Sequence, residues 1–272
     1  MAIDYAVKYS GIIDERFRLS SVTASAVNND YDFVGVRTVK IYSVSAATMN
    51  NYASAGANRY GVPAELDASS QEISLTRDRS FTFTIDRRNS LDTGGALDAG
   101  KALARQIDEV LIPEMDVYRI SAIATKAGGK KTAALTASNA YSAFLEGTEF
   151  LAENRVPLNG RVALITPKFL KMIKQDPSFV RSGDVSQEML LHGQVGQVDG
   201  VPLVLVPGSY MPTATEFIIA SNFSACGPVK LAEYKIHDNP PGINGWLVEG
   251  RVVYDCFVPE NKKNGLFAWK TA

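Results

Sequence analysis

The sequence predicts an α+β fold made of a long antiparallel hairpin, a long helix and a compact lobe of short strands and helices. In residues 73–85 apolar side chains keep one parity, with Arg77 and Arg79 breaking the apolar face midway, which is typical of a half-buried strand, here about 43 Å long at ~3.3 Å per residue. Residues 95–127 repeat apolar side chains at spacings of three, four and seven, which predicts an amphipathic helix. After residue 161, short apolar runs and helical segments are separated by proline and glycine turns, which predicts the lobe.

The hairpin is expected to follow an extended N-terminal arm, residues 1–30, whose Ser and Asn residues give it loop character. The first strand is predicted over residues 33–44. Its apolar parity holds at Val34 and has slipped by Val39, so a bulge is expected between them. The second strand is predicted over residues 71–86. Ordinary strands have about 5 or 6 residues, so this length needs an explanation.

A long tip, residues 46–70, joins the two strands and has no sustained period. A lone two-stranded hairpin is only marginally stable in water, and so long a loop is uncommon in a compact domain unless it has a function. We therefore expect the tip to clasp a partner. A disordered surface loop on an ordinary sheet is the alternative. The residues expected to make the contact are Tyr52, Tyr60, Gly61, Val62 and Pro63.

The long helix over residues 95–127 contains Pro113. Because proline has no N–H to donate, we expect it to bend the helix axis or to split the helix. Capping residues and glycines set the predicted ends. The predicted boundaries are Asp92 or Thr93 as the N-cap, Gly128–Gly129 as the end, and a second helix over residues 138–154.

The lobe is expected to be organised around VPLVLVP, residues 201–207. This run is apolar on both faces, as in a central strand that is covered on both sides. We expect Val201, Leu203 and Val206 in or near its core. From Gly245 onward, two long strands are expected, joined at PENKKNG. The other predicted elements are strands over 161–166, 216–221 and 229–236, helices over 167–175 and 185–193, and a turn at 193–200.

The composition is that of a globular protein, with 272 residues, 46% apolar and 21% charged. The net charge of −1 gives no electrostatic case for binding nucleic acid or an anionic membrane. No apolar run approaches the ~20 residues of a membrane span, and the first residues lack the features of a signal peptide. Cys226 and Cys256 are too few for a disulfide framework. We expect a soluble protein made in a cytoplasm.

No active site is predicted, and no catalytic, cofactor-binding or metal-binding residue is proposed. His192 and His237 lack the neighbouring Cys, His or carboxylate ligands that a zinc site needs, and are expected to be structural or surface residues. The stretch AGGKKTA lacks the first glycine and the final Ser or Thr of a phosphate-binding loop. The acidic residues expected to be solvated or ion-paired on the long helix are Asp108, Glu109, Glu114 and Asp116.

Four stretches, in this order, resemble the major capsid proteins of tailed bacteriophages, which have the Hong Kong 97-like fold. They are SLTRDRSFTFTIDRRNSLD, VLIPEMDVYR, GQVGQVDGVPLVLVP and RVVYDCFVPENKKNG. The resemblance covers the chain from about residue 30. It implies an N-terminal arm over 1–30, an extended E-loop hairpin and its base over 31–93, a peripheral domain over 94–157 with its spine helix over 95–127, an axial domain over 158–242, and closing strands of the peripheral domain over 243–272.

The resemblance implies a protein without catalysis that self-assembles into the hexamers and pentamers of an icosahedral head around double-stranded DNA. The implied partners are further copies of the chain, a separate scaffolding protein, a portal and a cement protein. Contact with packaged DNA is expected to be weak and non-specific, and no membrane is involved. The protein is expected in the virion, after assembly in the host bacterial cytoplasm. The alternatives are an encapsulin-type compartment shell and an enzyme with an unrecognised site.

Within this resemblance, Arg87 and Arg88 are expected to pair with carboxylates, at least one of them across a subunit boundary. The planar guanidinium suits bidentate contact with a carboxylate. Two solvated charges at a strand end are the alternative. The hairpin tip is likewise expected to rest on a neighbour's peripheral domain, near its spine helix.

Overall fold

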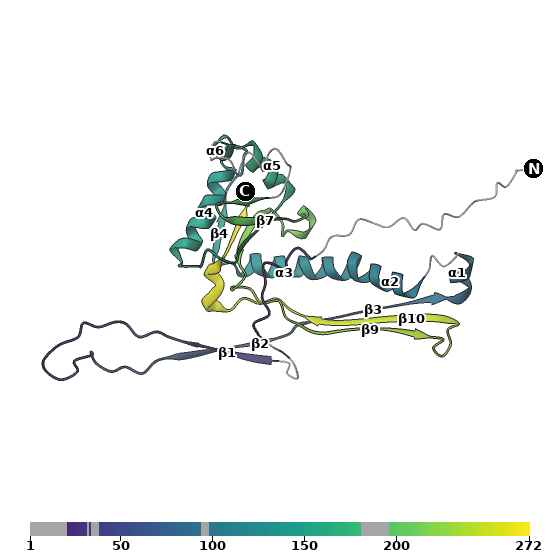
Figure 1. Cartoon of the computed structure of the whole chain (residues 1–272), viewed down its shortest axis with the longest axis horizontal. Helices are drawn as coiled ribbons and strands as arrows, with labels where there is room; N and C mark the ends of the chain where they lie inside the picture. Colours follow the sequence, from purple (N-terminus) through teal and green to yellow (C-terminus); the bar gives the residue numbers. More distant parts are fainter. Residues whose placement is uncertain (1–20, 32, 34–37, 94–97, 181–195) are drawn as a thin grey trace, which may run out of the picture.

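The computed structural model describes residues 21–31, 33, 38–93, 98–180 and 196–272. The lobe stands at the middle of the molecule, the long helix and a long sheet extend to one side, and the hairpin extends to the opposite side (Figure 1). The predicted α+β class is confirmed. Several predictions lie wholly or partly outside those residues, namely the extended arm over residues 1–20, the strand parity at Val34, the first residues of the long helix at 95–97, the helix over 185–193 and the start of the turn at 193–200.

The lobe is built on a six-stranded mixed sheet. Its middle strands are β5 (Arg161–Ile165) and β8 (Thr215–Ser221), and every residue of both is buried. β5 pairs in parallel with one outer neighbour, β7, and antiparallel with β8. The outer strands are β4 (Gly129–Thr132) and β11 (Leu266–Lys270) on the side of β8, and β7 (Val201–Leu205) and β6 (Gln197–Val198) on the side of β5.

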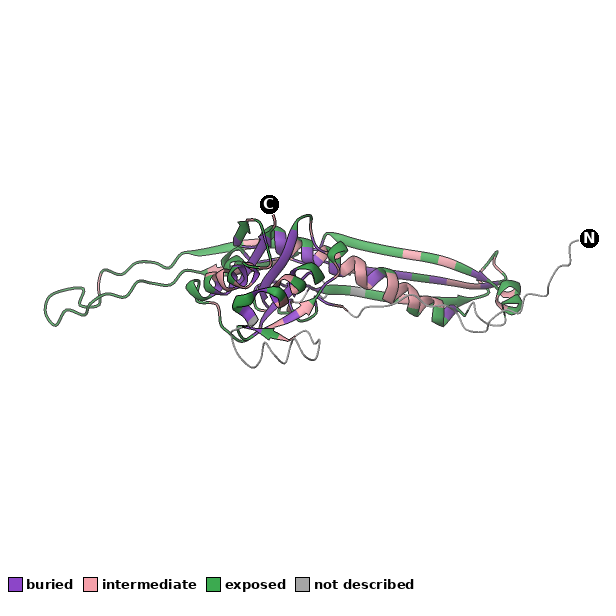
Figure 2. Cartoon of the chain, turned by 90° about the horizontal axis from the view of Figure 1, so that it is seen from above, coloured by how far each residue is buried: buried purple, intermediate pink, exposed green. Residues whose placement is uncertain are grey.

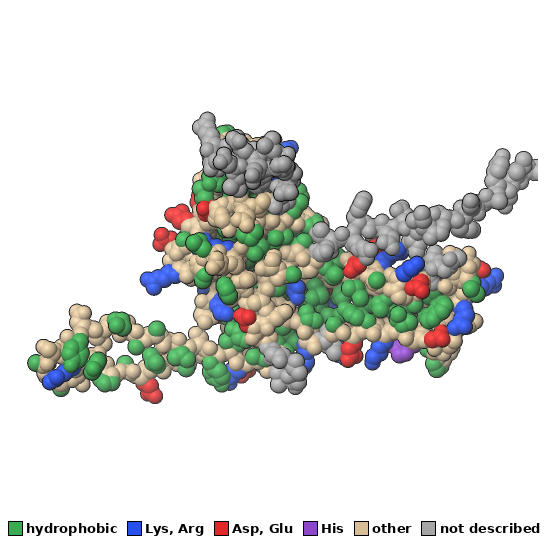
Figure 3. Space-filling view, viewed as in Figure 1, with side chains coloured by type: hydrophobic (Ala, Val, Ile, Leu, Met, Phe, Trp, Pro, Cys, Tyr) green, Lys and Arg blue, Asp and Glu red, His purple; other side chains and the backbone are tan. Residues whose placement is uncertain are grey.

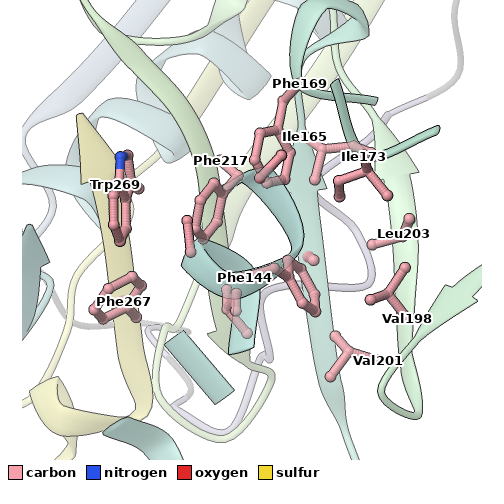
Figure 4. Packing of buried hydrophobic residues seen from close by; sticks show 14 of the residues in the cluster. Phe144, Ile165, Phe169, Ile173, Val198, Val201, Leu203, Phe217, Phe267 and Trp269 are labelled. Atoms are coloured by element: carbon pink, nitrogen blue, oxygen red, sulfur yellow. The ribbon is translucent and has the colours of Figure 1, made fainter. Parts of the chain in front are cut away.

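Aromatic side chains fill the space between one face of this sheet and two helices, α4 (Ala140–Glu153) and α5 (Pro167–Gln175). Figure 4 shows these rings gathered from strands and helices alike. Phe169 stacks on Phe217 with ring centroids 4.5 Å apart, and Phe217 lies 5.8 Å from Trp269. Offset ring stacking adds to the free energy gained from burial alone.

The opposite face of the sheet packs against α3 (Ile112–Lys126). Ile120 and Ile123 of this helix are fully buried against Ile218 and Leu164 of the two middle strands. Because both faces are covered, these strands are nearly continuous apolar runs in the sequence. The remaining short helices are α6 (Pro177–Val180), η2 (Gly208–Tyr210) and η3 (Glu260–Gly265).

The run at residues 201–207 forms β7, but β7 is not the central strand that we expected. Among the described strands it is next to the edge of the sheet, with the two-residue strand β6 beyond it. Val201, Leu203 and Val206 are buried, as predicted, whereas Leu205 is 37% exposed. An apolar run indicates burial, but it does not indicate how many strands lie beside it.

The stretch before β7 is a tight hairpin rather than a turn from helix to strand, in the part that the structure describes. Val198 of β6 pairs antiparallel with Val201 of β7. Between them, Asp199 and Gly200 both have positive φ, 52° and 72°. An Asp-Gly pair is the preferred sequence for such a two-residue connection.

The long helix continues from Ala99 to Lys126 with one π-helical turn inside it. It consists of α2 (Ala99–Gln106), η1 (Ile107–Leu111) and α3. The N–H of Ile112 bonds to the carbonyl of Ile107, five residues back, immediately before Pro113. A π turn rearranges the hydrogen bonds at the point where proline offers no donor. The irregularity predicted at Pro113 is therefore a π turn and not a break.

The start of the long helix is capped by Asp98, so the prediction of Asp92 or Thr93 as its cap was wrong. The Asp98 carboxylate accepts a hydrogen bond of 2.9 Å from the N–H of Lys101. Asp92 and Thr93 instead end a separate short helix, α1 (Arg87–Asp92), which Asp86 caps. Asp86 directly precedes α1 and Asp98 directly precedes α2. The sequence pattern did not show that these are two separate helices.

The long helix lies along a three-stranded antiparallel sheet of β3 (Arg77–Asp86), β10 (Gly245–Tyr254) and β9 (Val229–Asp238), with β10 in the middle. Side chains at alternate positions of β3, including Phe81, pack against α2. Two predictions were wrong here, because β9 was expected in the lobe and both closing strands, β10 and β11, were expected in one sheet of the peripheral domain. The two closing strands belong to different sheets, since local alternation predicts a strand but not its partner.

The projecting hairpin consists of β1 (Thr38–Val44) paired antiparallel with β2 (Ala68–Ser74). The single long strand predicted over residues 71–86 was wrong, because β2 and β3 are separate strands in separate sheets. The break falls at Leu75 and Thr76. Arg77 and Arg79 interrupt the apolar alternation directly after the break, but the parity of Ile73 and Leu75 returns at Phe81, so the two strands looked like one.

We predict that Leu203→Ala lowers the free energy of unfolding by about 2–5 kcal/mol, because it leaves a cavity in a packed core. Leu203 is 6% exposed and belongs to the aromatic cluster of the lobe. Leu205→Ala, two residues along the same strand, is the matched control and should cost much less. Urea unfolding measures both. Equal shifts of the two midpoints would contradict the burial of Leu203.

Candidate interaction surface

The hairpin tip, residues 45–67 between β1 and β2, is exposed almost throughout (Figure 2). Every residue in it except Gly61 is classed as exposed, and Tyr60 is 84% exposed. Exposed apolar side chains that gather in one place mark an interaction site more often than isolated ones do. The large apolar residues exposed here are Met49, Tyr52, Tyr60, Val62 and Leu66.

The tip nevertheless has a defined shape of its own. Tyr52 and Tyr60 meet edge to face, with ring centroids 5.0 Å apart. The N–H of Gly61 donates to the carbonyl of Asn58 at 2.8 Å, and the φ of Gly61 is +95°, which favours glycine. Pro63 follows in an exposed position. The structure thus brings together the residues predicted from the sequence, and within the described chain no second element covers them.

A buried carboxylate holds the junction between hairpin and body, which we call the elbow (Leu75, Thr76 and Asp255). Asp255 accepts hydrogen bonds from the N–H and the hydroxyl of Thr76 at 2.7 and 2.9 Å. Its other oxygen accepts from the Tyr118 hydroxyl at 2.6 Å and from the N–H of Cys256 at 2.7 Å. Burial, and then the hydrogen bond to Asp255, raise the pKa of Tyr118, which therefore remains a donor at neutral pH.

A small apolar cluster packs around the elbow. Ile73 and Leu75 of the hairpin are buried with Phe33, and Phe257 packs on the cluster. The rings of Phe33 and Phe257 are 6.0 Å apart, edge to face. The hairpin is therefore packed at its base and exposed at its end. The sequence did not predict the elbow, and the only sign of it is Asp255 directly after an apolar strand.

Arg87 and Arg88 both pair with carboxylates of the same chain. Arg87 donates to Asp238 at 3.0 Å and to the side-chain oxygen of Asn239 at 3.2 Å. Arg88 pairs with Asp92, four residues on in α1, at 3.4 Å. Pairing with carboxylates is thus observed within the chain, and a partner in another subunit remains a prediction.

Asp116 is the position whose environment the sequence predicted least well. We expected a solvated carboxylate on the long helix, but Asp116 is fully buried. It accepts hydrogen bonds from the Ser21 hydroxyl at 2.8 Å, the N–H of Val22 at 2.9 Å and the Thr23 hydroxyl at 2.5 Å. It fixes the end of the predicted arm to α3. A run of Ser and Thr in the arm is the only signal that the sequence offers.

The two cysteines are free and buried. Burial raises the pKa of Cys256 to about 12, and it also raises the pKa of Cys226. A thiol that stays protonated at neutral pH is a poor nucleophile. Neither cysteine is therefore set up for covalent catalysis.

A shallow groove of about 410 Å³ crosses the face of the three-stranded sheet that points away from the helix. Charged side chains line it, including Lys235, Glu249 and Arg251. Arg251 pairs with Asp78 at 2.6 Å, and His237 meets Glu249 at 3.2 Å. The groove is an ion-paired outer face rather than an apolar pocket with a few converging polar groups. His237 is a surface residue, as predicted.

Among the residues that the structure describes, His, Cys, Asp and Glu side chains form no group of three able to hold a metal ion. No helix in the same described ranges is both long enough and apolar enough to cross a bilayer. His192 lies outside them.

The comparison with protein families finds one match that covers most of the chain. The model of the family described as phage capsid protein matches residues 69–267. The match begins in the hairpin and ends in the last strand of the lobe sheet. No curated protein matches the sequence.

Solved structures of phage capsids have the same fold. Mycobacterium phage Che8 aligns with a TM-score of 0.72 and 17% identity, over 98% of this chain and 96% of that one. The capsid of cyanophage P-SCSP1u aligns with a TM-score of 0.79 and 11% identity, over 98% and 93%. The mature capsid of bacteriophage PhiM1 aligns with a TM-score of 0.74 and 12% identity, over 99% and 92%. At these identities the likeness is one of fold.

We predict that Asp255→Ala lowers the free energy of unfolding by about 3 kcal/mol, because a buried donor left without a partner costs about 1–3 kcal/mol. Thr76, Tyr118 and Cys256 all lose an acceptor in this variant. Asp238→Ala removes an exposed carboxylate and should cost less than about 1 kcal/mol. Chemical unfolding of both variants tests this. If Asp255→Ala is as stable as its control, the elbow does not depend on the carboxylate.

Proposed function

Because the chain belongs to the phage capsid protein family and has the Hong Kong 97-like fold, we propose that it assembles into hexamers and pentamers that close as an icosahedral head around double-stranded DNA. It is a structural protein of the phage shell, and so of the virion, and not an enzyme. The encapsulin-type compartment is not favoured, since the family that matches is that of phage capsids.

The observation that carries this proposal is the projecting hairpin tip, whose apolar side chains have no cover in the described part of the molecule. A hairpin of two strands gains little stability by itself. Covering Tyr52, Tyr60 and Val62 therefore calls for a second copy of the chain. We place this contact on a neighbour's peripheral domain, near its long helix Ala99–Lys126.

The parts of the molecule take roles in this shell. The hairpin is the E-loop, the long helix is the spine of the peripheral domain, and the lobe is the axial domain, which meets its copies around five-fold and six-fold axes. A separate scaffolding protein, a portal and a cement protein are the proposed partners, and assembly takes place in the host bacterial cytoplasm. With a net charge of −1, the wall makes only weak, non-specific contact with DNA.

The decisive experiment is electron microscopy and light scattering of the purified protein, alone and with a candidate scaffold. We expect hexamers, pentamers or closed shells at high protein concentration. Light scattering that finds only monomers, with scaffold present, would contradict the proposal. Filaments or sheets without closure would contradict the icosahedral arrangement while leaving self-association intact.

We predict that replacing residues 50–66 with a short Gly-Ser turn leaves the circular dichroism and melting of the monomer nearly unchanged, because these residues make few contacts within the chain. Closed shells should become rare or fragile, since the tip is buried only between subunits. A monomer that melts far lower would mean that the tip packs on its own body. Normal shells would mean that the tip is surface decoration.

The intersubunit role predicted for the arginine pair is proposed for Arg88. Arg87 is engaged with Asp238 and Asn239 of its own chain, whereas the Arg88 side chain is 86% exposed and, among the described residues, pairs with Asp92 one helix turn away. Arg88→Ala should weaken assembly without changing monomer stability, and Arg87→Ala should change stability first. Shells of Arg88→Ala that form normally and withstand high salt would exclude the role.

A further inference from the structure

The outer edge of β9 has no strand partner among the described residues. Ile236 of β9 pairs across the sheet with Val248, which is fully buried, yet Ile236 itself is 44% exposed. Ala232, on the same face, is also exposed. Proteins usually cover or blunt such an edge, because its unpaired N–H and C=O groups accept another strand.

The geometry of the helix explains why this side is open. A helix with its side chains is about 10–12 Å across, and strands lie about 4.8 Å apart. One helix therefore covers about two strands, and β9 is left at the rim. Figure 3 shows apolar side chains gathered in a band on this side, between the long helix and β9 and β10.

The band is continuous with the core beneath the helix. Tyr234 of β9 packs on the cluster of Leu111 and Val252, and it stacks against Phe81 with ring centroids 6.2 Å apart. Gly250 lies between the two rings, and a Cβ at that position would collide with the Phe81 ring. The apolar core beneath the helix thus continues across the sheet to β9, where its last side chains are partly exposed.

The other face of β9 is charged. Glu233, Lys235 and His237 alternate with Ala232, Tyr234 and Ile236 and point away from the helix. A strand that completes this edge therefore needs apolar side chains at every second position. Its intervening side chains must suit the charges of β9.

Residues 2–9, AIDYAVKY, have this pattern. Ile3, Tyr5, Val7 and Tyr9 are apolar, and Asp4, Ala6 and Lys8 come between them. In an antiparallel register with Val7 opposite Tyr234, Tyr5 lies opposite Ile236 and Lys8 lies opposite Glu233. A parallel register with Tyr5 opposite Tyr234 sets Asp4 against Glu233, which is unfavourable.

The chain before Ser21 starts from a place that suits this contact. Thr23 is held by Asp116, and Arg119, one turn further along the same side of α3, donates to the carbonyl of Gly227 at 2.9 Å. Gly227 lies two residues before β9. Eleven residues, 10–20, span up to about 36–40 Å when extended, which is more than the length of β9 itself, roughly 33 Å for its ten residues.

We propose that residues 2–9 add a fourth, antiparallel strand to the outer edge of β9 in the same molecule, with Val7 opposite Tyr234. This strand covers the apolar band and pairs the open edge by main-chain hydrogen bonds, which is the usual physics of strand addition. The proposal does not depend on the shell role, since it concerns the single chain.

Hydrogen exchange of the β9 amides tests the proposal in the full chain. The amides of β9 that do not bond to β10 should be protected, and Val7→Asp should raise their exchange rates by about tenfold or more, because it sets a charge against the apolar band. Ala6→Asp, opposite Lys235 on the charged face, is the matched control and should retain protection. Unprotected outward amides in the unaltered chain, or equal effects of the two variants, would overturn the proposal.

A designed disulfide tests the register and the origin of the strand. Lys8→Cys with Glu233→Cys should form a bond on oxidation of dilute protein and give a linked monomer, since directly opposite residues fall within disulfide range. Val7→Cys with Glu233→Cys places the thiols on opposite faces and should not link. Failure of the first pair to link would overturn the register. Linkage only between molecules would show that the edge takes the segment of another copy, and would overturn the assignment to the same chain.

Discussion

The architecture depends on one buried carboxylate, Asp255, at the end of β10. It accepts four hydrogen bonds, from the chain between β2 and β3, from the long helix and from its own neighbour in sequence. A buried charge is tolerated only when its hydrogen-bonding capacity is filled. Satisfying Asp255 therefore requires that β2 turn away from β3 at Thr76 and that Tyr118 face the sheet. The direction of the hairpin follows from this requirement.

Burial is distributed unevenly along the molecule. Among the described residues, the sheet of the lobe has helices on both faces, the long sheet has one helix on one face, and the hairpin has no helix packed on it. Stability should follow the same order, because apolar burial is the main favourable term in folding. The rim of the long sheet and the hairpin tip are the places where we propose that further chain completes the burial, from the same molecule in the first case and from another in the second.

The long helix connects these regions because its sides have different partners. One side carries Ile120 and Ile123 into the lobe, a second places Tyr118 at the elbow, and Asp116 holds the beginning of the described chain. The helix can contact the lobe, the elbow and residues 21–23 at the same time only if each of its sides keeps a fixed direction around the helix axis. The π turn before Pro113 changes that rotation between α2 and α3. The same helix can thus follow the long sheet and then enter the lobe.

The sequence by itself determined the class of fold, the long helix, the lobe and the exposed tip, because each has a local signal: a period, a proline or glycine turn, or a lack of apolar content. It also determined that Leu203 is buried. Only the tertiary structure decided which strands pair, that the alternation from Ile73 to Ile85 belongs to two sheets, and that Asp116 and Asp255 are buried. Strand pairing and the burial of a carboxylate depend on residues far away in the chain. A local pattern shows where apolar and charged side chains stand along the chain. Which residues those side chains contact is decided by three-dimensional packing.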